Sequence, residues 1–181
     1  QSDVPFVLYC GTLGPHEPFI PPQRFLDMYK DVEIKLPANY SDFMKDKPGM
    51  YRKLRDRFDQ LSEEEQIEAL RYYYAFCTYE DYCFGRLVDK LKEMGQYDNT
   101  IIIYTSDHGE YAAEHGIWGK GLPSFNSAYH IPAVVRWGNG QSVAGVEVDD
   151  MLSIADFHAT FIDAAGIDAE VPHTSRSILP Y

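Results

Sequence analysis

Apolar and polar positions along this chain follow two different spacings, which predict strands and helices in turn. Short apolar runs at residues 4–10, 100–106 and 131–137 are bounded by turn residues, as buried strands are. Apolar residues recur at helical spacing from Ile67 to Leu91, after a Ser62–Glu65 capping box and before Gly95. A second helical stripe at 153–166 ends at Gly166. The chain is therefore expected to form both strands and amphipathic helices.

The order of these segments indicates an α/β fold. The predicted order is strand, long helix, strand, loop, strand and helix. This order indicates a mostly parallel sheet with flanking helices. Residues 23–29 are a short helix candidate, and the Pro-rich segment 11–22 is expected to be an ordered loop. Residues 30–60 mix charges with Pro37, Pro48 and Gly49, and we expect them to run over the surface. No internal repeat or linker divides the sequence, so residues 1–181 are predicted to be a single domain.

Composition supports a packed core and argues against a nucleic-acid surface. The 181 residues are 45% hydrophobic and 14% aromatic, and the net charge is −12. Binding of nucleic-acid phosphates needs clustered Lys and Arg, which an acidic chain of this kind does not favour. The acidic stretch 59–68 is interpreted as a solvated helix start. No run is long enough to cross a membrane, and no signal peptide is visible.

Three cysteines, Cys10, Cys77 and Cys83, cannot all pair with one another. Cys77 and Cys83 lie six positions apart in one predicted helix, on different faces, which makes them poor disulfide partners. No Cys/His cluster indicates structural zinc. We expect all three to be buried thiols.

Polar residues that could bind a metal or an anion follow the predicted strands at 4–10 and 100–106. Asp107 and His108 come at the carboxyl end of the 100–106 strand, where α/β sheets place their sites. Asp is a ligand for Ca²⁺, Mg²⁺ or Mn²⁺, and His adds a nitrogen that transition metals prefer. The alternative is a capping Asp beside an ordinary polar His. Spacing by itself leaves both interpretations open.

Lys120 and His16 are two further candidates. Lys120 lies between Gly119 and Gly121, which permit tight backbone turns, and a cation there could stabilise an oxyanion. His16 lies in "GPHEP", a rigid frame that suits a positioned proton donor or anion contact. A solvated turn lysine and a turn histidine are the commoner explanations for such residues.

Taken together, these motifs resemble those of the sulfatases, within the alkaline-phosphatase-like superfamily. The matching stretches are, in chain order, "PFVLYCGTLGPHEPFIPP", "EDYCFGRLVDKLKEMGQYDNTIIIYTSDHGE", "EHGIWGKG", "AYHIPAVVRW" and "SRSILP". They extend over nearly the whole chain in the family's order and spacing. The resemblance implies the alkaline-phosphatase-like sulfatase fold.

The resemblance also implies a role for each candidate residue. Asp107 and His108 would bind the metal, which in sulfatases is usually Ca²⁺ and less often Mg²⁺ or Mn²⁺. Lys120 and His16 would hold the sulfate oxygens, and one of them would protonate the leaving alcohol. His115 and Trp118, in "HGIWGK", would line the substrate pocket or brace it from a second shell.

Other parts of the family's site are not found in this sequence. Sulfatases make a formylglycine nucleophile from the Cys or Ser of a Cys/Ser-x-Pro-x-Arg motif, and none of the three cysteines fits that motif. The paired aspartates that complete the metal site also lie in the family's amino-terminal half. The chain is therefore expected to be the carboxyl-terminal part of a sulfatase catalytic domain.

The resemblance predicts that the full-length protein is a sulfuric ester hydrolase acting on a sulfated small molecule or glycan. One alternative is a phosphonate monoester or phosphodiester hydrolase of the same superfamily, and another is a chain that is non-catalytic as isolated. The missing half or a second copy is an expected partner, whereas nucleic acid is not. Many sulfatases are exported, so a periplasmic or extracellular location is expected.

Overall fold

The computed structural model describes residues 4–139, 145–168 and 171–179. Their contacts group into two compact units, residues 1–136 and 137–181, which are described separately. The single-domain expectation for 1–181 stays a prediction. No helix in the described part of the chain is both long and apolar enough to span a membrane.

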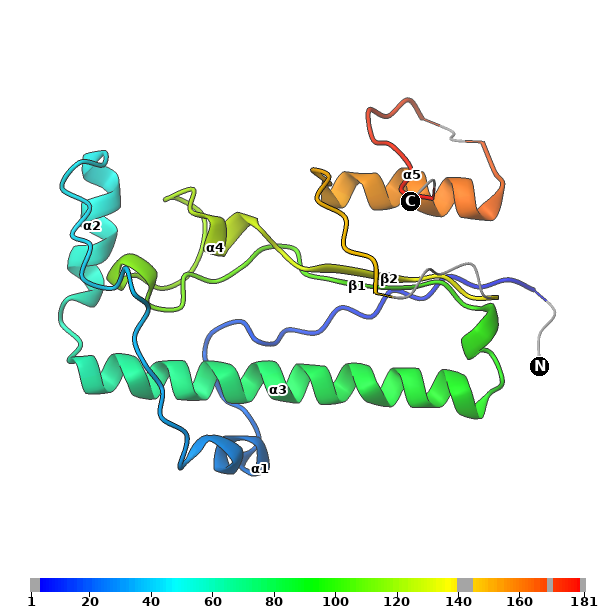
Figure 1. Cartoon of the computed structure of the whole chain (residues 1–181). Helices are drawn as coiled ribbons and strands as arrows, with labels where there is room; N and C mark the ends of the chain where they lie inside the picture. The colour runs from blue at the N-terminus through cyan, green and yellow to red at the C-terminus, as the bar shows by residue number, and fades with distance from the viewer. Residues whose placement is uncertain (1–3, 140–144, 169–170, 180–181) are drawn as a thin grey trace. The chain divides into compact units, whose positions relative to one another are not determined.

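The long helix α3, Glu63–Glu93, dominates the first unit (Figure 1). It begins where the sequence predicts, because the Ser62 hydroxyl accepts the Glu65 N–H and the Glu65 carboxylate accepts the Ser62 N–H. It ends at Gly95, whose positive φ lets the Gln96 N–H reach the Leu91 carbonyl. The short helices α1, Gln23–Leu26, and η1, Asp27–Tyr29, pack against α3 as the sequence suggested.

The sheet differs from the expected one. Within the described residues it has two strands, β1 (Ile102–Thr105) and β2 (Ala133–Arg136), which pair antiparallel with Ile102 opposite Arg136. The chain leaves β1 at its carboxyl end and, after the loop 106–132, re-enters from that same end, so β2 must run the other way. The mostly parallel sheet stays an expectation that this chain does not confirm.

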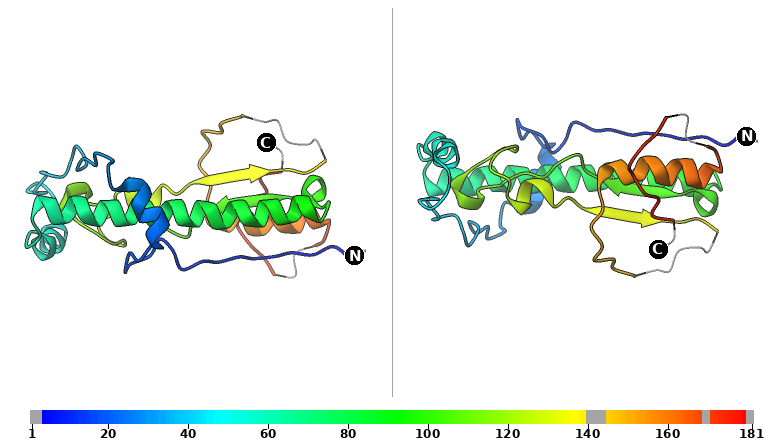
Figure 2. Two further views of the ribbon diagram at one scale, coloured as in Figure 1. Left: turned by 90° about the horizontal axis from the view of Figure 1, so that it is seen from below. Right: turned by 90° about the horizontal axis from the view of Figure 1, so that it is seen from above.

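Residues 4–10 do not form the predicted buried strand. They are extended without a strand partner, and Val7 and Tyr9 are 82% and 91% exposed. Figure 1 shows this segment on the same side of α3 as β1 and β2, and in the views of Figure 2 it runs apart from β2. The apolar run has no neighbouring strand in the described chain to supply hydrogen bonds and burial, so its strand pattern is not realised here. Cys10, in the same segment, is exposed rather than buried.

The segment 30–60 is more ordered than predicted. It contains α2, Gly49–Phe58, which begins directly after Pro48. Ile34 and Met44 are buried, and so is the Arg55 side chain. The guanidinium of Arg55 donates to the carbonyls of Tyr40 and His115, at 2.5 and 2.6 Å. A buried cation that satisfies distant carbonyls is not visible as hydrophobic periodicity, which is why the sequence pattern missed this helix.

The short helix η2 (Tyr97–Asn99) connects α3 to β1. The loop 106–132 after β1 contains η3 (Glu114–Gly116) and α4 (Asn126–Tyr129). Two buried clusters join this loop to the helices. One is centred on Leu70 and Trp118, and the other on Met44, Tyr111 and Ile117.

The second unit contains α5, Ile154–Ala165, as predicted for 153–166. Ser153 and Asp156 form a capping box, and Gly166 ends the helix in the left-handed conformation. Residues 175–179 pack on this helix. The Ile178 N–H donates to Thr160 Oγ1 and the Arg176 N–H to Asp156 Oδ1, at 3.1 and 2.9 Å.

Candidate anion and metal site

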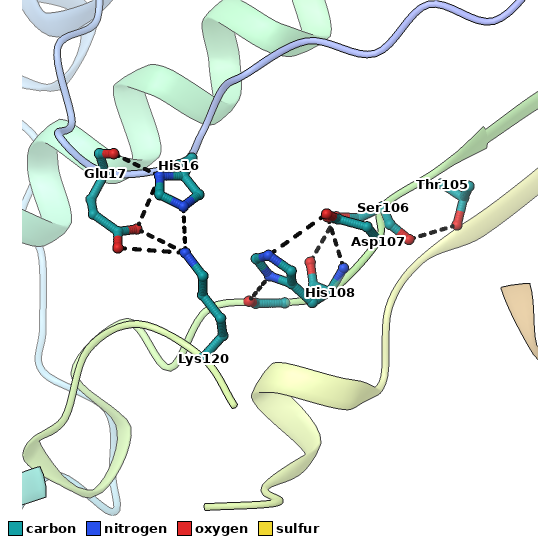
Figure 3. A network of polar contacts seen from close by, with 8 residues as sticks. His16, Glu17, Thr105, Ser106, Asp107, His108 and Lys120 are labelled. Atoms are coloured by element: carbon teal, nitrogen blue, oxygen red, sulfur yellow. Dashed lines mark hydrogen bonds and ion pairs between the residues drawn. The ribbon is translucent and has the colours of Figure 1, made fainter. Parts of the chain in front are cut away.

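Lys120 and His16, 104 positions apart in the sequence, meet in the folded chain (Figure 3). The Lys120 ammonium lies 2.5 Å from His16 Nε2 and 3.4 Å from both carboxylate oxygens of Glu17. Their side chains are about a quarter to a half exposed, at 27% for Lys120 and 41% for His16. Two nitrogen donors at one accessible point can bind an anionic oxygen from solvent.

The contacts of His16 define its tautomer in this arrangement. The lysine ammonium has only N–H donors, so His16 Nε2 must accept from it. The other nitrogen, Nδ1, then carries the proton and donates to the Glu17 carbonyl at 2.6 Å. In this arrangement the Nε2 lone pair faces the lysine, and Nε2 would become a second donor only after taking up a proton.

Glu17 supplies a counter-charge that the sequence analysis did not single out. Partial burial raises the pKa of the Glu17 carboxyl. A hydrogen bond from its own backbone and the charges of Lys120 and His16 lower this pKa, and together they outweigh burial, so the net shift is downward. Glu17 therefore stays ionised and balances Lys120 when no anion is bound. It directly follows His16, and nothing in the sequence pattern distinguishes it from a solvated carboxylate.

The turn that carries Lys120 is anchored to the segment just after β1. The Gly119 N–H donates to Glu110 Oε1 at 2.5 Å, and the Gly119 carbonyl accepts the Tyr111 N–H at 3.0 Å. The buried Tyr111 hydroxyl donates to the Gly121 carbonyl at 2.8 Å. Both glycines have φ near +90°, which explains why glycine flanks the lysine on each side.

Glu110 is the second residue that sequence reasoning missed. Burial raises the pKa of its carboxyl, although hydrogen bonds from the Gly119 and Ala112 N–H groups act in the opposite direction. A carboxylate that lies five positions after the end of β1 has no spacing that marks it as an anchor. Only the folded structure shows that Glu110 accepts the Gly119 N–H in the turn that carries Lys120.

Asp107 and His108 lie at the carboxyl end of β1, as predicted (Figure 3). His108 Nδ1 is 2.9 Å from the Gly109 carbonyl, so it carries the proton and leaves the Nε2 lone pair free. That Nε2 is 3.7 Å from Asp107 Oδ2, and the Asp107 side chain is 85% exposed.

This donor pair fits a divalent cation as part of a larger ligand set. Two ligands of one Ca²⁺ ion, each at about 2.4 Å, commonly lie about 3.5 Å apart. The backbone bond to Nδ1 is also the kind of contact that orients a metal-binding His. Among residues 4–139, 145–168 and 171–179, no group of three or more His, Cys, Asp or Glu side chains could hold a metal ion. Of the ligands that a divalent cation needs, Asp107 and His108 could supply two.

Gly109 explains the third position of the Asp-His-Gly motif. A side chain at this residue would meet the Ser127 carbonyl oxygen at 1.9 Å, so only glycine fits. Its N–H donates to the Ala128 carbonyl at 2.9 Å, which ties the strand end to α4. The close backbone approach fixes the two candidate ligands just before it.

His115 is held among structural partners. Its Nδ1 is 2.9 Å from Asp42 Oδ2 and its Nε2 is 3.2 Å from Asn39 Nδ2, while the ring stacks on Phe125 with centroids 4.0 Å apart. Hydrogen bonds from the Met44 N–H and from His115 lower the pKa of Asp42. Asp42 was not expected from the sequence, since it lies in the segment interpreted as an irregular surface loop.

Trp118 is buried in the core rather than open to solvent. Its indole N–H donates to the Gln66 side-chain oxygen of α3 at 2.5 Å, and its ring lies 5.6 Å from Phe19. The described contacts therefore join "HGIWGK" to the long helix and to the loop that carries His16.

Comparison with known proteins decides which family these motifs represent. The sequence model of the Sulfatase family matches residues 1–167. The chain belongs to the sulfatase family. Among curated proteins, this sulfatase chain is 29% identical to arylsulfatase K of Bos taurus over 99% of its own length and 35% of that protein. It is also 29% identical to an arylsulfatase of Clostridium perfringens, over 90% of its length and 34% of that protein.

Solved structures agree on the fold of this sulfatase chain. Phosphonate monoester hydrolase SpPMH from Silicibacter pomeroyi is 26% identical with a TM-score of 0.72, covering 92% of this chain and 35% of that one. BT4656 in complex with its substrate D-glucosamine-2-N,6-O-disulfate is 21% identical with a TM-score of 0.67, covering 92% and 45%. The fold is therefore of the alkaline-phosphatase-like type. The sulfatase chain spans about a third of the length of the curated relatives it matches.

Proposed function

We propose that the protein to which this chain belongs hydrolyses a sulfate ester of a sulfated carbohydrate. The carrying observation is the contact between Lys120 and His16, which brings two nitrogen donors from distant segments to one accessible point. A sulfate ester carries one negative charge on its three non-bridging oxygens, and such a cationic pair can neutralise it. Arylsulfatases among the relatives support the same chemistry.

The described residues suggest how the reaction would be assisted. Lys120 and His16 would release each other and donate to the sulfate oxygens as negative charge develops in the transition state. One of the two would then give a proton to the leaving alcohol oxygen: the Lys120 ammonium carries N–H groups at this point, and His16 would do so after taking up a proton at Nε2. Glu17 would keep the lysine in place between turnovers.

Asp107 and His108 would hold part of a divalent cation, for which we propose Ca²⁺ ahead of Mg²⁺ or Mn²⁺. When bound, such an ion would supply positive charge for the sulfate group and for a formylglycine nucleophile expected from elsewhere in the protein. His115 and Trp118 are proposed to brace this pocket, since their described polar contacts are to Asp42, Asn39 and Gln66.

The test compares an aryl sulfate with an aryl phosphonate monoester, using the full-length protein. We expect the larger kcat/KM for the sulfate ester. The full-length sequence should also contain a Cys/Ser-x-Pro-x-Arg motif and paired aspartates. A protein that lacks them, or that turns over only the phosphonate, would sink the proposal.

A phosphonate monoester or phosphodiester hydrolase is the second candidate. The observation that favours it is the similarity to SpPMH, whose TM-score of 0.72 and 26% identity accompany coverage of 92% of the chain. The same pair of nitrogen donors would bind a phosphonate oxygen. The substrate comparison described above separates the two activities.

A further inference from the structure

Residues 45–57 carry a positive charge that contrasts with the rest of the chain. They contain six of the chain's 16 Lys and Arg residues and only two carboxylates, Asp46 and Asp56, although the whole chain has a net charge of −12. The six cations are Lys45, Lys47, Arg52, Lys53, Arg55 and Arg57. Most of them belong to α2 and the turn that precedes it.

Four of these cations form no ion pair within the described part of the chain, and three of the four, Arg52, Lys53 and Arg57, belong to α2. Arg55 is buried and bonded to Asp59, and Lys47 pairs with Asp46 at 2.7 Å. Arg52, Lys53 and Arg57 are exposed, and none of them forms an ion pair with any described carboxylate. At 100° per residue these three lie on one side of α2, which we call the basic strip, with Asp56 as the one acidic residue among them.

The opposite side of α2 packs on the loop that follows Lys120. Tyr51 lies 5.8 Å from Phe125, centroid to centroid, and its hydroxyl accepts the Ser124 N–H at 3.5 Å. Arg55 reaches the His115 carbonyl from the same side. The basic strip is therefore separated from this loop by one helix diameter, about 10 Å. It faces away from that loop.

We propose that Arg52, Lys53 and Arg57 bind the non-reacting sulfate groups of a multiply sulfated glycan chain. This inference rests on the proposed function, with the ester that is cleaved at Lys120 and His16. A polyanion is repelled by a chain of net charge −12, so it can approach only where cations are locally in excess. Arg side chains also match the geometry of sulfate-like oxyanions through paired N–H groups. An extended, charged glycan could then occupy the pocket and the strip together.

The binding experiment uses the full-length protein and a labelled dextran sulfate oligosaccharide, with Kd measured over a range of NaCl concentrations. The variant Arg52→Gln/Lys53→Gln/Arg57→Gln should bind about tenfold more weakly at low salt. The slope of log Kd against log[salt] should fall by about 2, since about 0.7 of a counterion is released for each of the three cations that meets a single-chain polyanion.

The matched control is Arg86→Gln/Lys90→Gln/Lys92→Gln, near the carboxyl end of α3, which removes the same number of charges from exposed positions. Its Kd should stay within about twofold of the wild-type value. Equal losses in both triple variants, or no loss in either, would overturn the proposal. So would tighter binding of a single-stranded DNA of the same charge, which would indicate a nucleic-acid surface instead.

A kinetic experiment separates this inference from the proposed function. In the strip variant we expect KM for a multiply sulfated oligosaccharide to rise while kcat is kept, and kinetics on a small aryl sulfate to stay unchanged. If the wild-type protein binds dextran sulfate through the strip but does not hydrolyse aryl sulfate, only the proposed function fails. A strip variant that loses activity equally on both substrates would contradict the inference.

Discussion

At the scale of single residues, Lys120 is positioned by its neighbours in the turn. The bonds of Glu110 to the Gly119 N–H and of Tyr111 to the Gly121 carbonyl fix the backbone on each side of the lysine. Glu110 and Tyr111 follow Asp107 and His108 closely in sequence. One short segment therefore carries the candidate metal ligands and orients the candidate anion-binding lysine.

Lys120→Ala in the full-length protein should lower kcat for a sulfate ester by about 10²- to 10³-fold, because a donor to developing charge is lost. The fold should stay intact, since the lysine side chain is partly exposed and its described polar contacts are with His16 and Glu17. The control Lys35→Ala removes an exposed lysine that pairs with Glu33. An unchanged rate in Lys120→Ala would remove this residue from the mechanism.

Glu110→Ala should lower kcat by about tenfold, a smaller effect, because the turn loses one anchor while the lysine is kept. Glu110→Gln retains an oxygen that can accept the Gly119 N–H, and it should recover most of the rate. A structural role alone would lower the thermal stability of the Ala variant without this recovery of kcat by Gln. Steady-state kinetics and thermal unfolding of both variants decide between these outcomes.

At the scale of secondary-structure elements, capping residues set helix limits that local sequence already specifies. The capping box at Ser62 and the glycines at 95 and 166 are found where the pattern predicts them, and α5 adds a second capping box at Ser153. Asp156 does more than cap α5, because its second oxygen accepts the Arg176 N–H from a segment 20 residues away. Sequence spacing gives no sign of that second contact.

The contribution of Asp156 should depend on pH. Hydrogen bonds from the Arg176 and Ser153 N–H groups lower the pKa of this carboxyl below its usual 3.8. Its stabilising effect should be complete above that value and be lost as the pH falls through the folded-state pKa. Asp156→Asn should therefore be less stable than wild type at pH 7, with a gap that narrows toward pH 2.

Urea unfolding followed by circular dichroism at the two pH values measures this gap. Asp163→Asn is the control, because Asp163 is an exposed carboxylate on the same helix. A difference in unfolding free energy of the same size at both pH values would show that Asn destabilises the helix through its different shape and not through the lost carboxylate charge.

At the scale of the whole molecule, the described residues form an incomplete site and leave apolar chain exposed. Asp107 and His108 are two candidate ligands without a described third, and the segment around Val7 and Tyr9 has no strand partner. Both features fit a chain that spans about a third of its relatives' length. Location outside the cytoplasm stays a prediction.

Calcium binding should therefore differ between this chain alone and the full-length protein. Two ligands should bind Ca²⁺ weakly, with a Kd in the millimolar range or above, whereas a complete site should bind far more tightly. Isothermal titration calorimetry of both proteins measures the difference, and the chain alone should show no sulfate ester hydrolysis. Asp107→Asn should abolish the tight site in the full-length protein. Tight binding by the chain alone would contradict the two-ligand arrangement.

The sequence by itself determined the features that depend on neighbours within a few residues. These are the limits of α3 and α5, the β1 strand end before Asp107, the glycines around Lys120 and the family motifs. Hydrophobic periodicity, capping and turn chemistry are local, so they can be read from the order of the residues.

Only the tertiary structure decided which distant groups meet. It paired β1 with β2 antiparallel, left residues 4–10 without a strand partner, and brought Lys120 to His16 and Glu17. It also revealed the anchor at Glu110 and the outward face of α2 with its unpaired cations. These outcomes depend on long-range packing and on the burial of polar groups, and neither leaves a periodic signal in the sequence.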